Sequence, residues 1–197
     1  MALPGSRGRW QYSGPMTSYA VFLRGINVGG ITIKMADLKE ALKSRPFDGV
    51  KTLLASGNVV LTSDLEPAAV KKEFEACLRE AFGYDAWVVV LTASRVAELV
   101  EACHYPADDK ATHTYITLAS DTAALDELFS AGESLGGMEQ TRLGPEASAW
   151  LAPAGGTLDS PFSKLSAKPK YKASTTTRNL RTMVKVRDAA AATERGD

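Results

Sequence analysis

An arginine and a glycine-rich loop follow the first apolar run of the chain, residues 19–23. The glycines of this loop allow backbone angles that turn main-chain N–H groups toward a ligand. The guanidinium of Arg24 adds a planar positive group that pairs well with carboxylates and phosphates. The alternative is an ordinary tight turn in which Arg24 forms a surface ion pair. The residue types of this segment therefore predict an anion site that includes Arg24, Gly25, Asn27 and Gly29.

Two further polar stretches have the composition of turns and helix starts. Ser56 and Asn58 flank a glycine between two predicted strands. Residues 174–179, with three consecutive threonines, are predicted to open the final helix, where free backbone N–H groups attract anions. Thr176 would offer such an N–H group and Arg178 a positive charge, with Asn179 beside them. The alternative is simple helix capping with solvated arginines.

Positive charge is concentrated toward the end of the sequence, although the 197 residues carry no net charge. The window 164–187 contains no Asp or Glu, and a stretch of this kind can bind phosphate groups, RNA or DNA. Only one aromatic residue, Tyr171, lies in it for base stacking, and a flexible, solvated basic loop is the alternative. Eight of the 23 cations fall in this window: Lys164, Lys168, Lys170, Lys172, Arg178, Arg181, Lys185 and Arg187.

The chain has none of the common enzyme signatures. It contains no P-loop, no dinucleotide-binding glycine fingerprint after the first strand and no nucleophile elbow. With two histidines and no pair of cysteines at metal-binding spacing, no metal site is predicted. The sequence assigns no cofactor, reaction or oligomeric state. Any chemistry would depend on positioning and electrostatics, because no activated nucleophile is visible.

The composition favours a protein of the cytoplasm. Its 45% hydrophobic and 23% charged residues are ordinary for a soluble globular protein. Cys77 and Cys103 fall on the apolar faces of predicted helices, which favours buried free thiols and a reducing compartment. The longest apolar run, residues 86–91, is too short to cross a bilayer, and residues 1–16 lack the apolar core of a signal peptide. We therefore expect no membrane association.

The apolar segments between the polar stretches predict an α+β fold. Residues 17–91 have the order βαββαβ, which is typical of a ferredoxin-like unit with two helices on one face of an antiparallel sheet. Residues 92–190 predict a second, similar α+β unit that includes the basic loop and a C-terminal helix over about 176–190, packing back on the first unit. We expect residues 1–16 to form a disordered tail and residues 191–197 to fray.

The polar stretches together resemble the bacterial domain-of-unknown-function family numbered 1697. The resemblance rests on residues 22–30, 35–38, 55–59 and 176–179, followed by Thr182 and Lys185. It implies an α+β protein with ferredoxin-like parts and no established biochemical activity. If the family repeats these polar loop residues, a shared pocket is the economical explanation. That pocket would comprise Arg24, Gly25, Asn27, Gly29, Ser56, Asn58, Thr176, Arg178 and Asn179.

Three functional hypotheses follow. In the first, these residues form a pocket for a small ligand whose phosphate or carboxylate pairs with Arg24 and Arg178. In the second, the basic stretch 164–187 binds nucleic acid, with an affinity that falls steeply with salt and does not depend on Arg24. In the third, the polar motifs form an internal hydrogen-bond network that joins the two halves of the chain.

Overall fold

The computed structural model describes residues 15–24, 32–83, 85, 87–107, 109–136, 138–155 and 160–194. Its first half consists of β1 (Thr17–Leu23), α1 (Met35–Leu42), β2 (Asp48–Leu53), β3 (Asn58–Ser63), α2 (Pro67–Phe82) and β4 (Val88–Thr92). The strands form an antiparallel sheet in the order β2-β3-β1-β4. This is the ferredoxin-like arrangement predicted for the first half, and the prediction is confirmed.

The apolar run that forms β1 is buried on both faces of this sheet. Tyr19, Val21 and Leu23 belong to the core under α1 and α2. Ala20 and Phe22 belong to a second core on the opposite face. This division follows from strand geometry, in which successive side chains point to opposite faces. Strand β1 therefore contributes to two separate cores, as do β3 and β4.

The second half repeats the topology of the first with additions. Helix α3 (Ala93–Ala102) is followed by β5 (Thr112–Ala119), α4 (Thr122–Glu133), β6 (Gln140–Gly144) and β7 (Ala147–Pro153). There follow α5 (Pro161–Ser166), α6 (Pro169–Lys172), β8 (Thr175–Asn179) and α7 (Leu180–Glu194). The antiparallel sheet has the order β6-β7-β5-β8, in which each strand matches its counterpart in the first sheet. None of the helices in the described residues is long and apolar enough to span a membrane.

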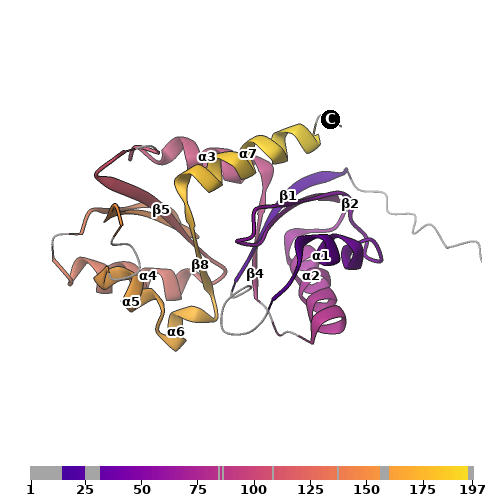
Figure 1. The fold of residues 1–197 in the computed structure, drawn as a ribbon, viewed down its shortest axis with the longest axis horizontal. Coiled ribbons are helices and arrows are strands. Elements are labelled where there is room, and N and C mark those ends of the chain that lie inside the picture. The colour runs from indigo at the N-terminus through magenta and orange to yellow at the C-terminus, as the bar shows by residue number, and fades with distance from the viewer. Residues whose placement is uncertain are drawn as a thin grey trace, which may run out of the picture.

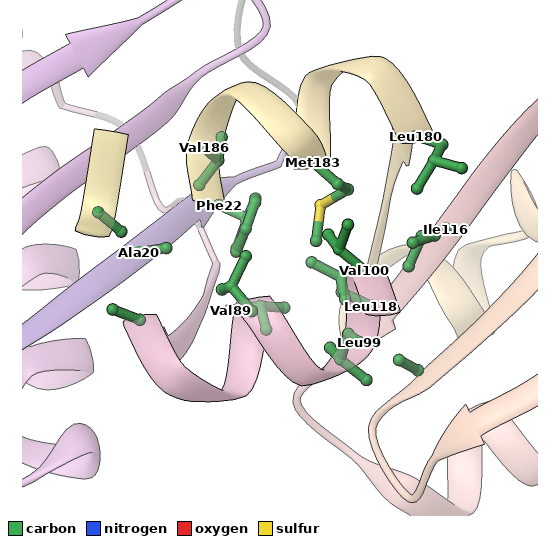
Figure 2. Packing of buried hydrophobic residues seen from close by; sticks show 14 of the residues in the cluster. Ala20, Phe22, Val89, Leu99, Val100, Ile116, Leu118, Leu180, Met183 and Val186 are labelled. Atoms are coloured by element: carbon green, nitrogen blue, oxygen red, sulfur yellow. The ribbon is translucent and has the colours of Figure 1, made fainter. Parts of the chain in front are cut away.

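The two sheets lie side by side, with the edge strands β4 and β8 facing each other (Figure 1). Helices α1 and α2 cover one face of the first sheet, while α4, α5 and α6 cover the corresponding face of the second. Helices α3 and α7 pack together across the opposite face. There, Phe22, Ile116 and Met183 belong to one core that joins both sheets (Figure 2). The C-terminal helix thus packs back on the first unit, as predicted.

The prediction that residues 174–179 open the final helix is wrong. Residues 175–179 form strand β8, in which Thr176 pairs with Leu118 of β5. Consecutive threonines suit a strand because their branched side chains are restricted in a helix. Helix α7 begins at Leu180, and the side chain of Asn179 accepts a 2.9 Å hydrogen bond from the N–H of Arg181 in its first turn. The capping role predicted for the threonines therefore belongs to Asn179.

An ion pair joins α3 to the turn between β6 and β7. Arg95 donates to both carboxylate oxygens of Glu146, with a distance of 3.3 Å for the second contact. Burial alone would raise the pKa of Glu146, but the hydrogen bonds and charge of Arg95 lower it below its usual value. The nearby Gly144 leaves room for this pair, because a Cβ there would lie 2.1 Å from a terminal nitrogen of Arg95.

Replacing Glu146 by glutamine is expected to lower the free energy of unfolding at pH 7 by about 1 kcal/mol, since the pair is partly shielded from water. An acid whose pKa is lowered in the folded state stabilises the fold above its unfolded pKa and loses this contribution as the pH falls. The difference from wild type should therefore shrink as the pH falls from the usual pKa of a glutamate through the lowered pKa of Glu146. Urea unfolding between pH 7 and about pH 2 measures it. Glu133→Gln, at the exposed end of α4, is the control, and a difference that does not change with pH would contradict the prediction.

Candidate functional site

Four of the predicted site residues meet at the seam between the two sheets. Two come from the first half, at the end of β1 and the start of β3, and two come from β8 in the second half. The four are Arg24, Asn58, Thr176 and Arg178. Ser56 joins them through a hydrogen bond to Asn58, whereas the side chain of Asn179 faces the start of α7. The remaining three positions lie outside the described residues: Gly25, Asn27 and Gly29.

Arg178 is at the centre of this arrangement. It is 7% exposed, and each of its five N–H donors has an acceptor in the protein. Its Nε donates to the side-chain oxygen of Asn58 at 2.6 Å. One terminal nitrogen donates to the carbonyl oxygens of Leu23 at 2.5 Å and Gly57 at 3.0 Å. The other donates within β8, to the hydroxyl of Thr176 at 2.7 Å and to the preceding carbonyl at 2.9 Å. One side chain of the second half therefore holds the end of β1 and the turn that leads into β3.

The turn between β2 and β3 positions the acceptor for this arginine. Asn58 is fully buried, and its amide nitrogen donates to the carbonyl of Leu53 and the hydroxyl of Ser56, both at 3.0 Å. These two bonds leave the amide oxygen facing Arg178. Leu54 in the same turn has a left-handed φ of 60°, which is uncommon for a bulky residue. The hydrogen bonds of Asn58 to Leu53 and Arg178 therefore hold the backbone of Leu54 in an unfavourable conformation.

Arg178 carries a buried positive charge that no described carboxylate neutralises. Its hydrogen-bond partners are uncharged oxygens, and its guanidinium carbon lies 5.8 Å from the ring centroid of Phe22. Burial, and to a smaller extent the positive charge of Arg24, lower the pKa of Arg178 to about 10. The side chain therefore remains charged at neutral pH. Two arginines together give the seam a positive potential.

Arg24 borders a small depression at this seam. Its guanidinium donates to the carbonyl of Thr175 and lies 3.4 Å from the hydroxyl of the same residue. The depression has a volume of about 10 Å³, which is room for one water-sized group. It can therefore receive one oxygen atom of an anion while the rest of the ligand stays outside. Its polar and aromatic lining residues are Arg24, Trp87, Ser120, Ser174, Thr175 and Thr176.

Two residues of this depression, Trp87 and Ser120, were not predicted from the sequence. Strand β4 begins at Val88, and Trp87 is 50% exposed. Ser120 comes after β5, and its backbone N–H donates to the carbonyl of Ser174 at 2.8 Å. Neither residue has a local sequence signal, because Ser120 is brought to the depression by the pairing of β8 with β5 and Trp87 by the approach of β4 to β8.

The basic stretch 164–187 does not form one continuous surface. Its four lysines up to residue 172 lie on or between α5 and α6, under the second sheet, whereas its last three cations lie on α7 over the opposite face (Figure 1). Buried Arg178 separates the two groups. Lys170 forms an ion pair with Glu127, and Arg187 pairs with Asp188. The charge that appears concentrated in the sequence is therefore divided in space.

Fold and site define a class of protein: two ferredoxin-like units joined by shared helices and a buried arginine. The described residues contain no group of three or more His, Cys, Asp or Glu that could hold a metal ion. The chain belongs to the family described as "Protein of unknown function (DUF1697)", which it matches over residues 16–147. The predicted family membership is confirmed. The match includes Arg24 and Asn58 and ends before β8.

A solved structure with the same fold is that of the conserved bacterial protein SP0830 from Streptococcus pneumoniae. It is 21% identical, with a TM-score of 0.72, and the comparison covers 89% of this chain and 99% of that chain. An unknown protein from Galdieria sulphuraria is 13% identical and aligns over 92% of this chain and 94% of its own. Its TM-score of 0.26 is too low to support an argument. No curated protein matches the chain.

Proposed function

We propose that the protein binds a small anionic ligand, bearing a phosphate or a carboxylate, at the seam between β4 and β8. The observation that carries this proposal is the buried charge of Arg178 beside Arg24, with no carboxylate among the described partners of Arg178. Both arginines would attract an anion at the depression, and the attraction is stronger where water is excluded. A bound anion would also offset part of the cost of burying Arg178.

The two arginines have different roles in this proposal. Arg178 uses all five donors inside the protein, so it attracts the anion through its charge alone. Arg24 borders the depression and contacts the anion directly, together with the hydroxyl groups of Ser120 and Ser174. Ser56 and Asn58 hold Arg178 in place. The contacts predicted for the loop after Arg24 remain part of the proposal: backbone N–H groups of Gly25 and Gly29 bind the anion, and Asn27 orients the ligand.

A purely structural role for these motifs is the second candidate. It is favoured by the bonds of Arg178 to Asn58 and Leu23, which lie 120 and 155 positions away in the sequence. Under this hypothesis the network joins the two halves and takes no ligand. We prefer both candidates to nucleic-acid binding through residues 164–187, because the cations of that stretch lie on two opposite faces.

Thermal unfolding in the presence of added anions tests the proposal. Wild type and Arg24→Ala are compared with inorganic phosphate, nucleoside phosphates, small carboxylates and a short RNA. A ligand at about a hundred times its dissociation constant stabilises the fold by about 2.7 kcal/mol, or about 5–10 °C for a chain of this length. We expect such a shift in wild type and not in Arg24→Ala. The control variant Lys172→Ala, which removes an exposed cation of α6, should keep it.

Two other outcomes are informative. If no anion shifts the unfolding temperature and Arg24→Ala is merely less stable, the proposal is wrong and the structural role stands. If RNA raises the unfolding temperature equally in wild type and Arg24→Ala, and the effect falls as salt is added, binding occurs through the exposed cations instead.

A further inference from the structure

The two ferredoxin-like units differ at one corner of their outer faces. In the first unit this corner lies beside the α1–β2 and β3–α2 connections. In the second unit it lies beside the α4–β6 and β7–α5 connections. In the first unit, apolar side chains fill it. The rings of Phe47 and Phe74 lie 6.2 Å apart, and Leu65 packs against the same core. The hydroxyl of Tyr19 donates to the carbonyl of Leu65 at 2.8 Å, which ties the connection before α2 to this core.

In the second unit the corresponding corner contains a cavity of about 250 Å³. It lies between the end of α4, the end of β7 and the start of α5. The sixteen-residue α2 of the first unit is replaced here by α5 and α6, which have six and four residues. Less helix therefore covers this sheet. Leu135 at the rim of the cavity is 41% exposed, whereas Phe47 at the filled corner is 7% exposed.

Aromatic rings form one wall of the cavity. Trp150 lines it, with ring centroids 4.9 Å from Tyr115 and 4.7 Å from Phe162. The indole N–H of Trp150 already donates to the hydroxyl of Thr117 at 3.1 Å. Trp150 is 2% exposed and Phe162 1% exposed, so these packed rings form an apolar base of the cavity rather than an open stacking surface, and the base has no unpaired indole donor.

The other described lining residues are uncharged. Ser160 is the one with a side-chain hydroxyl, which donates to the hydroxyl of Ser163 at 3.0 Å within the start of α5. Among these described residues a charged ligand would lose its water without gaining a partner, whereas an apolar ligand would gain contact area. The apolar residues that complete the wall include Leu135, Met138, Pro153 and Pro161.

We propose that this cavity is a binding site for a small uncharged apolar molecule, of the size of one or two rings. Its volume exceeds the roughly 150 Å³ of an apolar cavity that accommodates benzene. It lies just below the roughly 300 Å³ at which pockets for drug-sized ligands begin. The site is separate from the seam, because Trp150 lies on β7 and β5 runs between β7 and β8. The inference therefore does not depend on the anion proposal.

Titration of the ¹⁵N-labelled full chain with indole, followed by NMR, tests this site. The indole N–H signals of Trp10, Trp87 and Trp150 serve as three separate reporters. We expect a saturable shift of the Trp150 signal alone, with a dissociation constant on the order of 1 mM or lower. Leu135→Trp places a larger ring at the rim and is expected to weaken binding about tenfold or more. Met16→Trp, at an exposed position of the first half, should leave binding unchanged.

The proposal would be overturned by the absence of a saturable Trp150 shift, or by equal shifts of all three tryptophan signals. Unchanged affinity in a Leu135→Trp variant with a wild-type circular dichroism spectrum would also overturn it. Indole-3-carboxylate is the comparison ligand for the charge argument. It should bind more weakly than indole, and equal or tighter binding would contradict the assignment of an uncharged ligand.

Discussion

Replacing Arg178 by methionine is expected to lower the free energy of unfolding by about 3–5 kcal/mol. Methionine keeps most of the side-chain length but removes all five donors. The side-chain oxygen of Asn58 loses the partner to which it is bound at 2.6 Å, and the carbonyls of Leu23 and Gly57 each lose one. The loss is smaller than five separate hydrogen bonds, because the variant also removes the cost of a buried charge whose pKa is lowered to about 10.

Urea unfolding of wild type and Arg178→Met measures this difference. Lys185→Met is the matched control, because it removes a cation from the exposed side of α7 and should change stability by less than about 0.5 kcal/mol. Arg178→Lys keeps the charge but has at most three donors, and it should fall between wild type and Arg178→Met. If Arg178→Met were as stable as the control, the buried network would not hold the two halves together.

Replacing Met183 by alanine is expected to lower the free energy of unfolding by about 2–5 kcal/mol. Met183 is fully buried, and its side chain points from α7 toward α3 in the core between the helices and both sheets (Figure 2). Removing it leaves a cavity that the surrounding rigid elements cannot fill completely. Because this core includes residues of both units, such as Phe22 and Ile116, both units should lose stability together.

Denaturant unfolding followed by far-UV circular dichroism and by tryptophan fluorescence tests this coupling. We expect both probes to report one transition in wild type and in Met183→Ala, at a lower denaturant concentration in the variant. Met16→Ala, at a 54% exposed position, should leave the midpoint denaturant concentration unchanged. Two separate transitions, of which the variant shifts only one, would show that the units unfold independently.

Much of the fold could be predicted because its signals are local. The run 19–23 is apolar at every position, which predicts a buried strand, and the structure confirms it and shows burial on both faces. Gly83 ends α2 in the left-handed conformation that favours glycine, as its position after the helical pattern predicts. The stretch 174–179 has no such unique local signal, since threonine before a helical pattern suits both a cap and a strand. The pairing of Thr176 with Leu118 decided between them.

The sequence by itself determined the α+β class, the ferredoxin-like order of the first unit, the family and most of the polar residues at the seam. Only the tertiary structure decided how those residues meet. Arg178 contacts Asn58 and Leu23 because α3 and α7 place the two sheets edge to edge, a relation between segments more than a hundred positions apart. The division of the basic stretch by β8 was equally invisible in the sequence. So was the cavity beside Trp150, because local patterns specify which side chains are buried but not whether neighbouring elements fill the space between them.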